Sequence, residues 1–129
     1  MSIPDVPILC LFAQDFLCNG PVQKKFKAEY DSVPWLLAQN KAIGDIIPVF
    51  IDDRFVYYGI VKKHTYTVAL IEDVKRVLDK VVIHARANNI PDVNIPLNCY
   101  SELSEESIKT QTMQAFANSN VNYIFYTLY

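Results

Sequence analysis

The hydrophobic positions along the chain follow two periodicities, which predict strands and helices in alternation. Continuous apolar runs between turn-forming residues are typical of strands that are buried on both faces. Such runs predict strands at residues 8–13, 46–51, 55–61, 93–96 and 121–128. Apolar residues three to four positions apart predict a long helix over 68–87. Ser104 is a suitable N-cap for a further helix that runs to about residue 117.

Two more helices are predicted between the first two strands. Pro21, which is tolerated in the first turn of a helix, precedes a basic helix over 22–30. Asp31-Ser32 can cap a second helix that ends near Gly44. The order of elements therefore predicts a single domain over residues 1–129, with a three-layer α/β/α fold around a mixed central sheet.

The third predicted strand is the one at whose end a binding site is expected. Residues 55–61 show no alternation of polar and apolar types, so we expect them to form the central strand, covered on both faces. The run stops at Lys62, Lys63 and His64. In open α/β sheets, ligands bind beyond the carboxyl ends of the central strands. Residues 62–67 are therefore predicted to form the rim of a ligand site.

Composition and charge exclude several classes of function. The formal net charge of -2 and a pI near 5.6 argue against a nucleic-acid partner recognised through bulk positive charge. The cysteines form no Cys-x-x-Cys pair and leave one over under any disulfide scheme, which favours a reducing compartment. The N-terminus lacks the basic and apolar segments of a signal peptide, and no apolar run approaches the ~20 residues of a membrane span. We therefore expect a soluble protein of the cytoplasm or nucleus, without a membrane partner.

Lys62 is the sharpest candidate for chemistry. Desolvation at the end of a buried strand, beside the cationic Lys63, can make a lysine nucleophilic toward a carbonyl or a sugar aldehyde. The alternative is a solvated strand end with no chemical role. His64 and His84 have no second metal ligand at a useful spacing, and nothing in the sequence brings Cys99 close to either histidine. We expect neither a metal nor a cofactor.

Two loops could hold an anion on backbone N–H groups at the start of a helix. The first is Asn19-Gly20-Pro21, which has a single glycine and loses one donor at the proline. The second, residues 98–102, precedes the helix capped by Ser104, whose acidic first turn would repel an anion. Both loops are equally compatible with ordinary turns.

A family resemblance extends from about Ile8 to Leu128. The stretches that carry it are Gln14-Asp15, Asn19-Gly20-Pro21-Val22, Lys24-Lys25-Phe26, Val33 to Leu37, Gly44-Asp45, Arg54 to Lys63, Ile95-Pro96 and Tyr126-Thr127-Leu128. Together and in this order, they resemble a macro domain. Within that family, the chain is most similar to the branch that contains the terminal ADP-ribose protein glycohydrolase.

The resemblance implies a mixed sheet between helices and a cleft that binds ADP-ribose or an ADP-ribosylated protein. It also implies removal of ADP-ribose from acidic side chains by a lysine nucleophile and an aspartate that resolves the intermediate. Lys62 falls at the position of the lysine, and Glu102 is the carboxylate nearest to the position of the aspartate. The implied ligand-binding residues are Gln14, Asp15, Asn19, Gly20, Pro21, Asn98, Cys99, Tyr100 and Ser101.

The chain also departs from the family pattern. No strand with the adenine-reading Gly-Asp pair precedes Ile8, and both glycine-rich loops are replaced. An alternative function is therefore a macro-like scaffold without catalysis that acts through protein contacts, with a surface made of Tyr129, the helix over 22–30 and the loop after Pro96. A sheet edge left open by the missing strand would also favour self-association.

Overall fold

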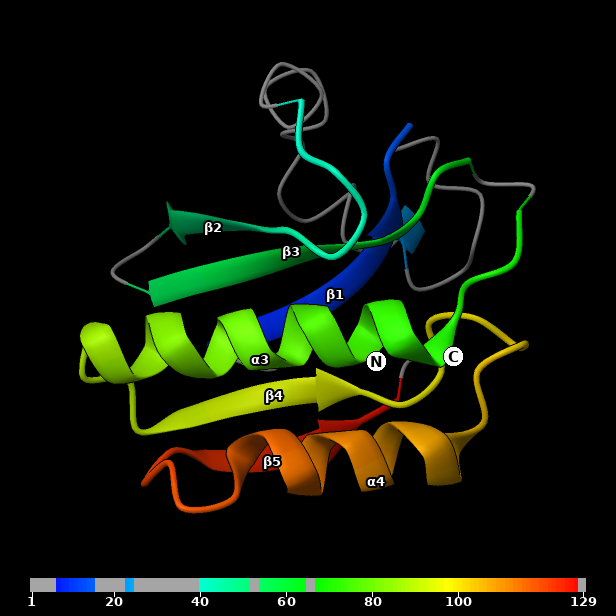
Figure 1. Cartoon of the computed structure of the whole chain (residues 1–129). Helices are drawn as coiled ribbons and strands as arrows, with labels where there is room; N and C mark the ends of the chain where they lie inside the picture. The colour runs from blue at the N-terminus through cyan, green and yellow to red at the C-terminus, as the bar shows by residue number, and fades with distance from the viewer. Residues whose placement is uncertain (1–6, 16–22, 25–39, 52–53, 65–66, 128–129) are drawn as a thin grey trace.

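A computed structural model describes residues 7–15, 23–24, 40–51, 54–64 and 67–127, and it contains a mixed sheet with helices packed on it (Figure 1). The strands are β1 (Ile8–Ala13), β2 (Ile46–Ile51), β3 (Arg54–Lys62), β4 (Asp92–Pro96) and β5 (Asn122–Tyr126). The helices within the described residues are α3 (Ile71–Ala87) and α4 (Glu105–Phe116), together with a helical piece at residues 23–24.

The five strands lie in the order β2-β3-β1-β4-β5. β2 and β3 form an antiparallel pair, whereas the β3–β1, β1–β4 and β4–β5 pairs are parallel. The prediction that the third strand is the central one is wrong by one place, because β1 holds the middle position. The run of β3 is nevertheless buried, and α3 packs on one of its faces, where Val77 lies against Gly59.

The middle of the sheet is covered on both faces, in agreement with the predicted three-layer α/β/α fold. α3 and α4 lie on one side of it (Figure 1). Every residue of β1 is buried, so its opposite face is shielded as well. The described part of that second layer is a helical piece at residues 23–24, from which Gln23 donates a hydrogen bond of 2.8 Å to the carbonyl oxygen of Leu11 in β1.

Helix boundaries differ from the sequence prediction in two places. α3 begins at Ile71 rather than at residue 68, because Leu70 is extended and supplies no side-chain cap. Residues 40–45 are not helical, so the predicted end of a helix near Gly44 is wrong. Apart from residues 23–24 and 40–44, the two helices predicted before β2 lie outside the described residues. α4 matches its prediction, and the Ser104 hydroxyl accepts a hydrogen bond of 3.1 Å from the Ser107 amide.

Gly59 sets how closely α3 approaches the sheet. A Cβ atom at this position would lie 2.5 Å from Cγ1 of Val77 and 3.3 Å from side-chain carbons of Leu11 and Leu9. Val77 belongs to α3, whereas the two leucines belong to the neighbouring strand β1. No side chain fits there without moving the helix, so the glycine fixes the spacing between these layers.

We expect Gly59→Ala to lower the free energy of unfolding by about 1–3 kcal/mol, because the added methyl group overpacks the interface. Urea denaturation of Gly59→Ala, Val77→Ala and the double variant measures this. The double variant is expected to cost less than the sum of the two single variants, since Val77→Ala removes the clashing methyl group. Additive costs would contradict this account of the packing.

Candidate functional site

The candidate site lies where β1, β3 and β4 end, at one edge of the sheet. The amide of Gln14, which follows β1, donates a hydrogen bond of 2.8 Å to the carbonyl oxygen of Lys62 at the end of β3. The register between these strands skips one residue just before this point, since Phe12 pairs with Ile60 and Ala13 with Lys62. Such a bulge redirects side chains at the rim of a sheet. Lys62 is thus the last strand residue, and not the first residue of a loop.

The Lys62 side chain is buried, with 6% of its surface exposed, and two groups contact its ammonium. Nζ lies 3.5 Å from Oε2 of Glu102 and 3.9 Å from the ring centre of Tyr100. The carboxylate attracts the positive charge, and the aromatic ring attracts it through its electron-rich face. Both partners come from the loop after β4, so the cation ties the end of β3 to that loop.

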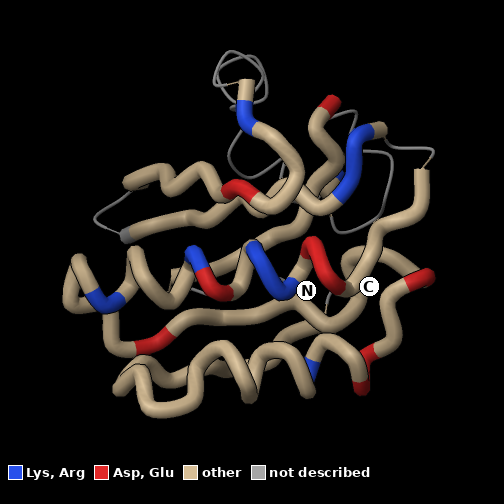
Figure 2. Tube along the Cα trace, viewed as in Figure 1, with Lys and Arg blue, Asp and Glu red and all other residues tan. Residues whose placement is uncertain are grey.

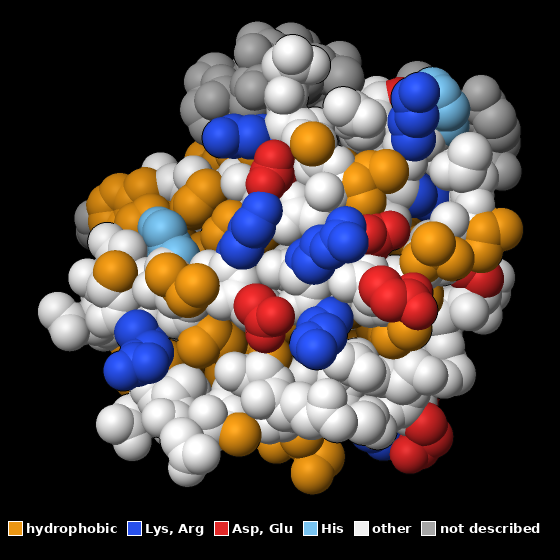
Figure 3. All heavy atoms as spheres, viewed as in Figure 1, with side chains coloured by type: hydrophobic (Ala, Val, Ile, Leu, Met, Phe, Trp, Pro, Cys, Tyr) orange, Lys and Arg blue, Asp and Glu red, His pale blue; other side chains and the backbone are white. Residues whose placement is uncertain are grey.

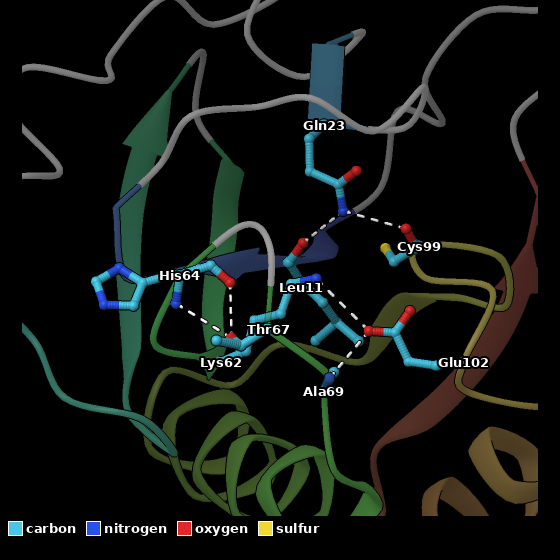
Figure 4. Close-up of polar contacts among 8 residues, drawn as sticks. All are labelled: Leu11, Gln23, Lys62, His64, Thr67, Ala69, Cys99 and Glu102. Atoms are coloured by element: carbon cyan, nitrogen blue, oxygen red, sulfur yellow. Dashed lines mark hydrogen bonds and ion pairs between the residues drawn. The ribbon is translucent and has the colours of Figure 1, made fainter.

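The Glu102 carboxylate is fixed in turn by the backbone. Its Oε2 accepts a hydrogen bond of 2.9 Å from the amide of Ala69, just before α3 (Figure 4). Burial alone would raise the pKa of Glu102, but the Ala69 amide and the positive charge of Lys62 outweigh it, so the pKa lies below its ordinary value. Glu102 is therefore ionised at neutral pH, where it can accept a proton but holds none to donate.

The loop after β4 lines a pocket of about 510 Å³, bounded by residues 97–103 and Glu105. The carbonyl oxygen of Cys99 accepts a hydrogen bond of 3.4 Å from Gln23, whose side-chain nitrogen also binds Leu11 (Figure 4). Burial raises the pKa of Tyr100, and the thiols of Cys99 and Cys10 and nearby carboxylates raise it further, so the phenol keeps its proton. The pocket wall thus combines a neutral phenol with the carboxylates of Glu102 and Glu105.

The structure brings together most of the predicted site residues that it describes. Asn98, Cys99, Tyr100, Ser101 and Glu102 line the pocket, and Lys62 touches two of them.

Gln14 and Asp15 lie at the end of β1, and the Asp15 carboxylate is 3.9 Å from Nδ1 of His64, an ion pair only when that histidine is protonated. His84 lies in the last turn of α3 and is not part of this cluster. Its Nδ1 is 2.7 Å from the hydroxyl of Tyr57. Asn19, Gly20 and Pro21 lie outside the described residues.

Three contributions to the site have no counterpart in the sequence prediction. Gln23 sat in a predicted basic helix, where it could not be distinguished from a solvated side chain, yet it is 2% exposed and joins two segments. The Ala69 amide is a backbone donor, and no side-chain pattern reveals one. The contact between Tyr100 and Lys62 depends on how the loop folds back. The sequence around Tyr100 gives no sign of this contact with Lys62.

Charges of both signs are interspersed over the face formed by α3 and α4 (Figures 2 and 3). Among residues 7–15, 23–24, 40–51, 54–64 and 67–127, no three His, Cys, Asp or Glu side chains are grouped so that they could hold a metal ion. Within the same described residues, no helix is both long and apolar enough to cross a membrane.

Comparison with known proteins gives sequence relatives and structural neighbours. The human protein "ADP-ribose glycohydrolase OARD1" is 27% identical over 118 residues, which are 90% of this chain and 78% of that protein. The bovine protein of the same name matches over the same shares. No family model matches the chain.

Solved structures share the fold closely. The macrodomain of Thermus aquaticus DarG superposes with a TM-score of 0.82 at 17% identity, covering 96% of this chain and 90% of that one. Thermosipho africanus DarTG in complex with ADP-ribose gives a TM-score of 0.80 at 10% identity, covering 95% of this chain and 38% of that one. The fold predicted from the family resemblance is therefore confirmed.

We expect Glu102→Gln to lower the free energy of unfolding by about 1–2 kcal/mol at pH 7, because the buried ammonium loses its charged partner. A carboxylate whose pKa is depressed by folding stabilises the protein above its unfolded pKa, near 4.5, and this contribution is lost as the pH falls through the folded pKa. The difference between the original chain and Glu102→Gln should therefore shrink below about pH 4.5.

Urea denaturation at a series of pH values measures this difference. Glu106→Gln is the matched control, since Glu106 is exposed in the first turn of α4, and it should change stability by about 0.5 kcal/mol or less. A Glu102→Gln effect that stays constant down to pH 3 would show that the charge of Glu102 does not act on Lys62.

Proposed function

We propose that this chain, which is a macrodomain, binds ADP-ribose at the carboxyl ends of β1, β3 and β4 and retains some ability to release it from acidic side chains. The observation that carries the proposal is the buried Lys62 held against Tyr100 and Glu102 beside a pocket of about 510 Å³. The names of the OARD1 relatives and the ADP-ribose complex of a structural neighbour support it. The site also lies where ligands bind in open α/β sheets.

The charges around the pocket indicate which part of ADP-ribose each part of the site would bind. Glu102 and Glu105 repel phosphate, so the pocket wall suits an uncharged ribose or base that packs on the Tyr100 ring. The diphosphate is assigned to the loop Asn19-Gly20-Pro21 and to the backbone of residues 98–101. Because neither loop has the bare backbone of a glycine-rich cradle, we expect weaker binding than such a cradle gives.

Lys62 is the proposed nucleophile. Its uncharged amine would attack the anomeric carbon of an ADP-ribose that is esterified to a glutamate or aspartate, and the acceptor carboxylate would leave. Water would then hydrolyse the lysine adduct, which frees ADP-ribose and restores the amine. Glu102, ionised and within 3.5 Å of Nζ, is placed to receive the proton that the lysine or the water must lose.

The same contacts limit the rate. Lys62 must shed a proton before it attacks, whereas the Glu102 carboxylate and the Tyr100 ring both attract the protonated ammonium. A carboxylate of lowered pKa is also a weak base. We therefore propose slow turnover, with recognition of ADP-ribose as the principal activity.

An ADP-ribosylated protein is the proposed macromolecular partner. A second hollow, of about 360 Å³, is lined by residues 68–72, 102–104 and Ser107, so Glu102 borders both hollows. Val68 and Leu70 are largely exposed beside it, at 65% and 55%. We assign this hollow to the modified protein, whose side chain would reach the first pocket past Glu102.

The proposed compartment is the cytoplasm or nucleus, in agreement with Cys10 and Cys99, whose sulfurs lie 3.9 Å apart without a disulfide between them. The scaffold alternative remains the second hypothesis. It is distinguished by the absence of ADP-ribose binding, and the polar loop after Pro96 would then contact a protein rather than a nucleotide.

Titration calorimetry with ADP-ribose tests recognition. We expect a dissociation constant in the micromolar range, about -8 kcal/mol, and a loss of about tenfold or more in Tyr100→Leu, which removes the ring from the pocket wall. No heat at millimolar ADP-ribose would overturn the proposal and favour the scaffold.

Release of ADP-ribose from a glutamate-modified protein tests the chemistry. Lys62→Ala is expected to abolish release, whereas Lys63→Ala should retain it, because Lys63 is exposed and lies one residue beyond the strand. Equal activity of Lys62→Ala and the original chain would exclude Lys62 as the nucleophile. Binding of ADP-ribose without release by the original chain would restrict the function to recognition.

A further inference from the structure

Two buried thiols lie side by side behind the candidate site. Sγ of Cys10 and Sγ of Cys99 are 3.9 Å apart, although the residues are 89 positions apart in the sequence. Neither cysteine forms a disulfide in the structure. Cys10 belongs to β1 and is fully enclosed, whereas Cys99 is 6% exposed and lines the pocket. Of the two, Cys99 is therefore the thiol that a small oxidant can reach.

We propose that Cys10 and Cys99 form a reversible disulfide that reshapes the pocket when the protein meets a peroxide. The Cys99 sulfur attacks one oxygen of hydrogen peroxide, which gives a sulfenic acid and releases one water. The Cys10 sulfur then attacks the sulfur of Cys99, and the hydroxyl leaves as a second water. The two thiols together lose two electrons and two protons, and the peroxide is reduced to two waters. A dithiol restores both thiols.

The geometry makes the loop the part that moves. A disulfide holds its sulfurs about 2.05 Å apart, so the two atoms must approach by about 2 Å. β1 pairs with β3 on one side and β4 on the other, which fixes Cys10 in the interior of the sheet. Cys99 lies in the loop after β4, where its carbonyl oxygen accepts a long hydrogen bond of 3.4 Å from Gln23.

Movement of Cys99 also displaces its neighbour Tyr100, whose ring covers the Lys62 ammonium at 3.9 Å. Oxidation would therefore change the pocket wall and the contact between Tyr100 and Lys62. The formation of the disulfide stands on the two thiols alone. Its effect on ADP-ribose rests on the proposed function.

Peptide mapping under non-reducing conditions tests the linkage. The protein used is the Cys18→Ser variant, because the third cysteine, which lies outside the described residues, could otherwise exchange with a disulfide. This variant is treated with hydrogen peroxide and then alkylated. We expect a Cys10–Cys99 linked peptide within one chain, lighter by two hydrogens than the separate peptides and cleaved by dithiothreitol. Separate alkylated or sulfinic peptides, or a linkage between chains, would overturn the proposal. This readout leaves Cys10 and Cys99 unchanged and needs no ligand.

Cys10→Ser in the same background is the matched variant, with its fold checked by circular dichroism. It should give a sulfenic acid at Cys99 that dimedone traps, and no linked peptide. Oxidation should weaken ADP-ribose binding by about tenfold in the Cys18→Ser chain, and dithiothreitol should restore the affinity. The same treatment should leave the affinity of the Cys10→Ser variant unchanged. A linked peptide with unchanged affinity would overturn the effect on the pocket. Absence of ADP-ribose binding before oxidation would instead count against the proposed function. The peptide mapping would still show whether the disulfide forms.

Discussion

A lysine ammonium that is almost enclosed by protein is the constraint on which the arrangement of the site depends. Lys62 is 6% exposed, and a charge removed from water to that extent costs several kcal/mol unless it is paired. Glu102 and Tyr100 supply the pairing, and both come from the loop after β4. That loop is therefore held against the end of β3, and the same loop lines the pocket. The amide of Ala69 fixes the carboxylate, so the start of α3 joins the same cluster.

The fold follows from the sequence where burial decides it. Apolar runs predicted β1 and β2 with their observed bounds and β3 within one residue at either end. They did not predict that β1 is the middle strand, because a continuous apolar run reports burial and carries no information on the order of strands. The start of α3 was missed for a similar reason. Val68 continues the apolar spacing of the helix, yet the backbone at Leu70 is extended.

The site is only partly foreseeable from residue types. The family resemblance proposed roles for Lys62 and Glu102, and the structure places these side chains 3.5 Å apart. Their contact depends on the bulge before Lys62, on the Ala69 amide and on the fold of the loop, none of which has a side-chain signature. Gln23 lies next to lysines in a segment that the sequence predicts only as a basic helix, so its residue type gives no sign of its burial. Long-range contacts of this kind are set by the packing of distant elements, so local patterns cannot encode them.

The central claim, that ADP-ribose binds where β1, β3 and β4 end, is tested most directly by amide chemical shifts of labelled protein during an ADP-ribose titration. The account predicts saturable shifts at the amides of residues 97–103, at Ala69 and at Gln14, which surround Lys62 and the pocket. The hollow near the starts of β4 and β5, lined by Arg86, Asn89 and Asn120 among others, should stay unchanged. Shifts confined to that hollow, or no shifts at millimolar ADP-ribose, would contradict the account.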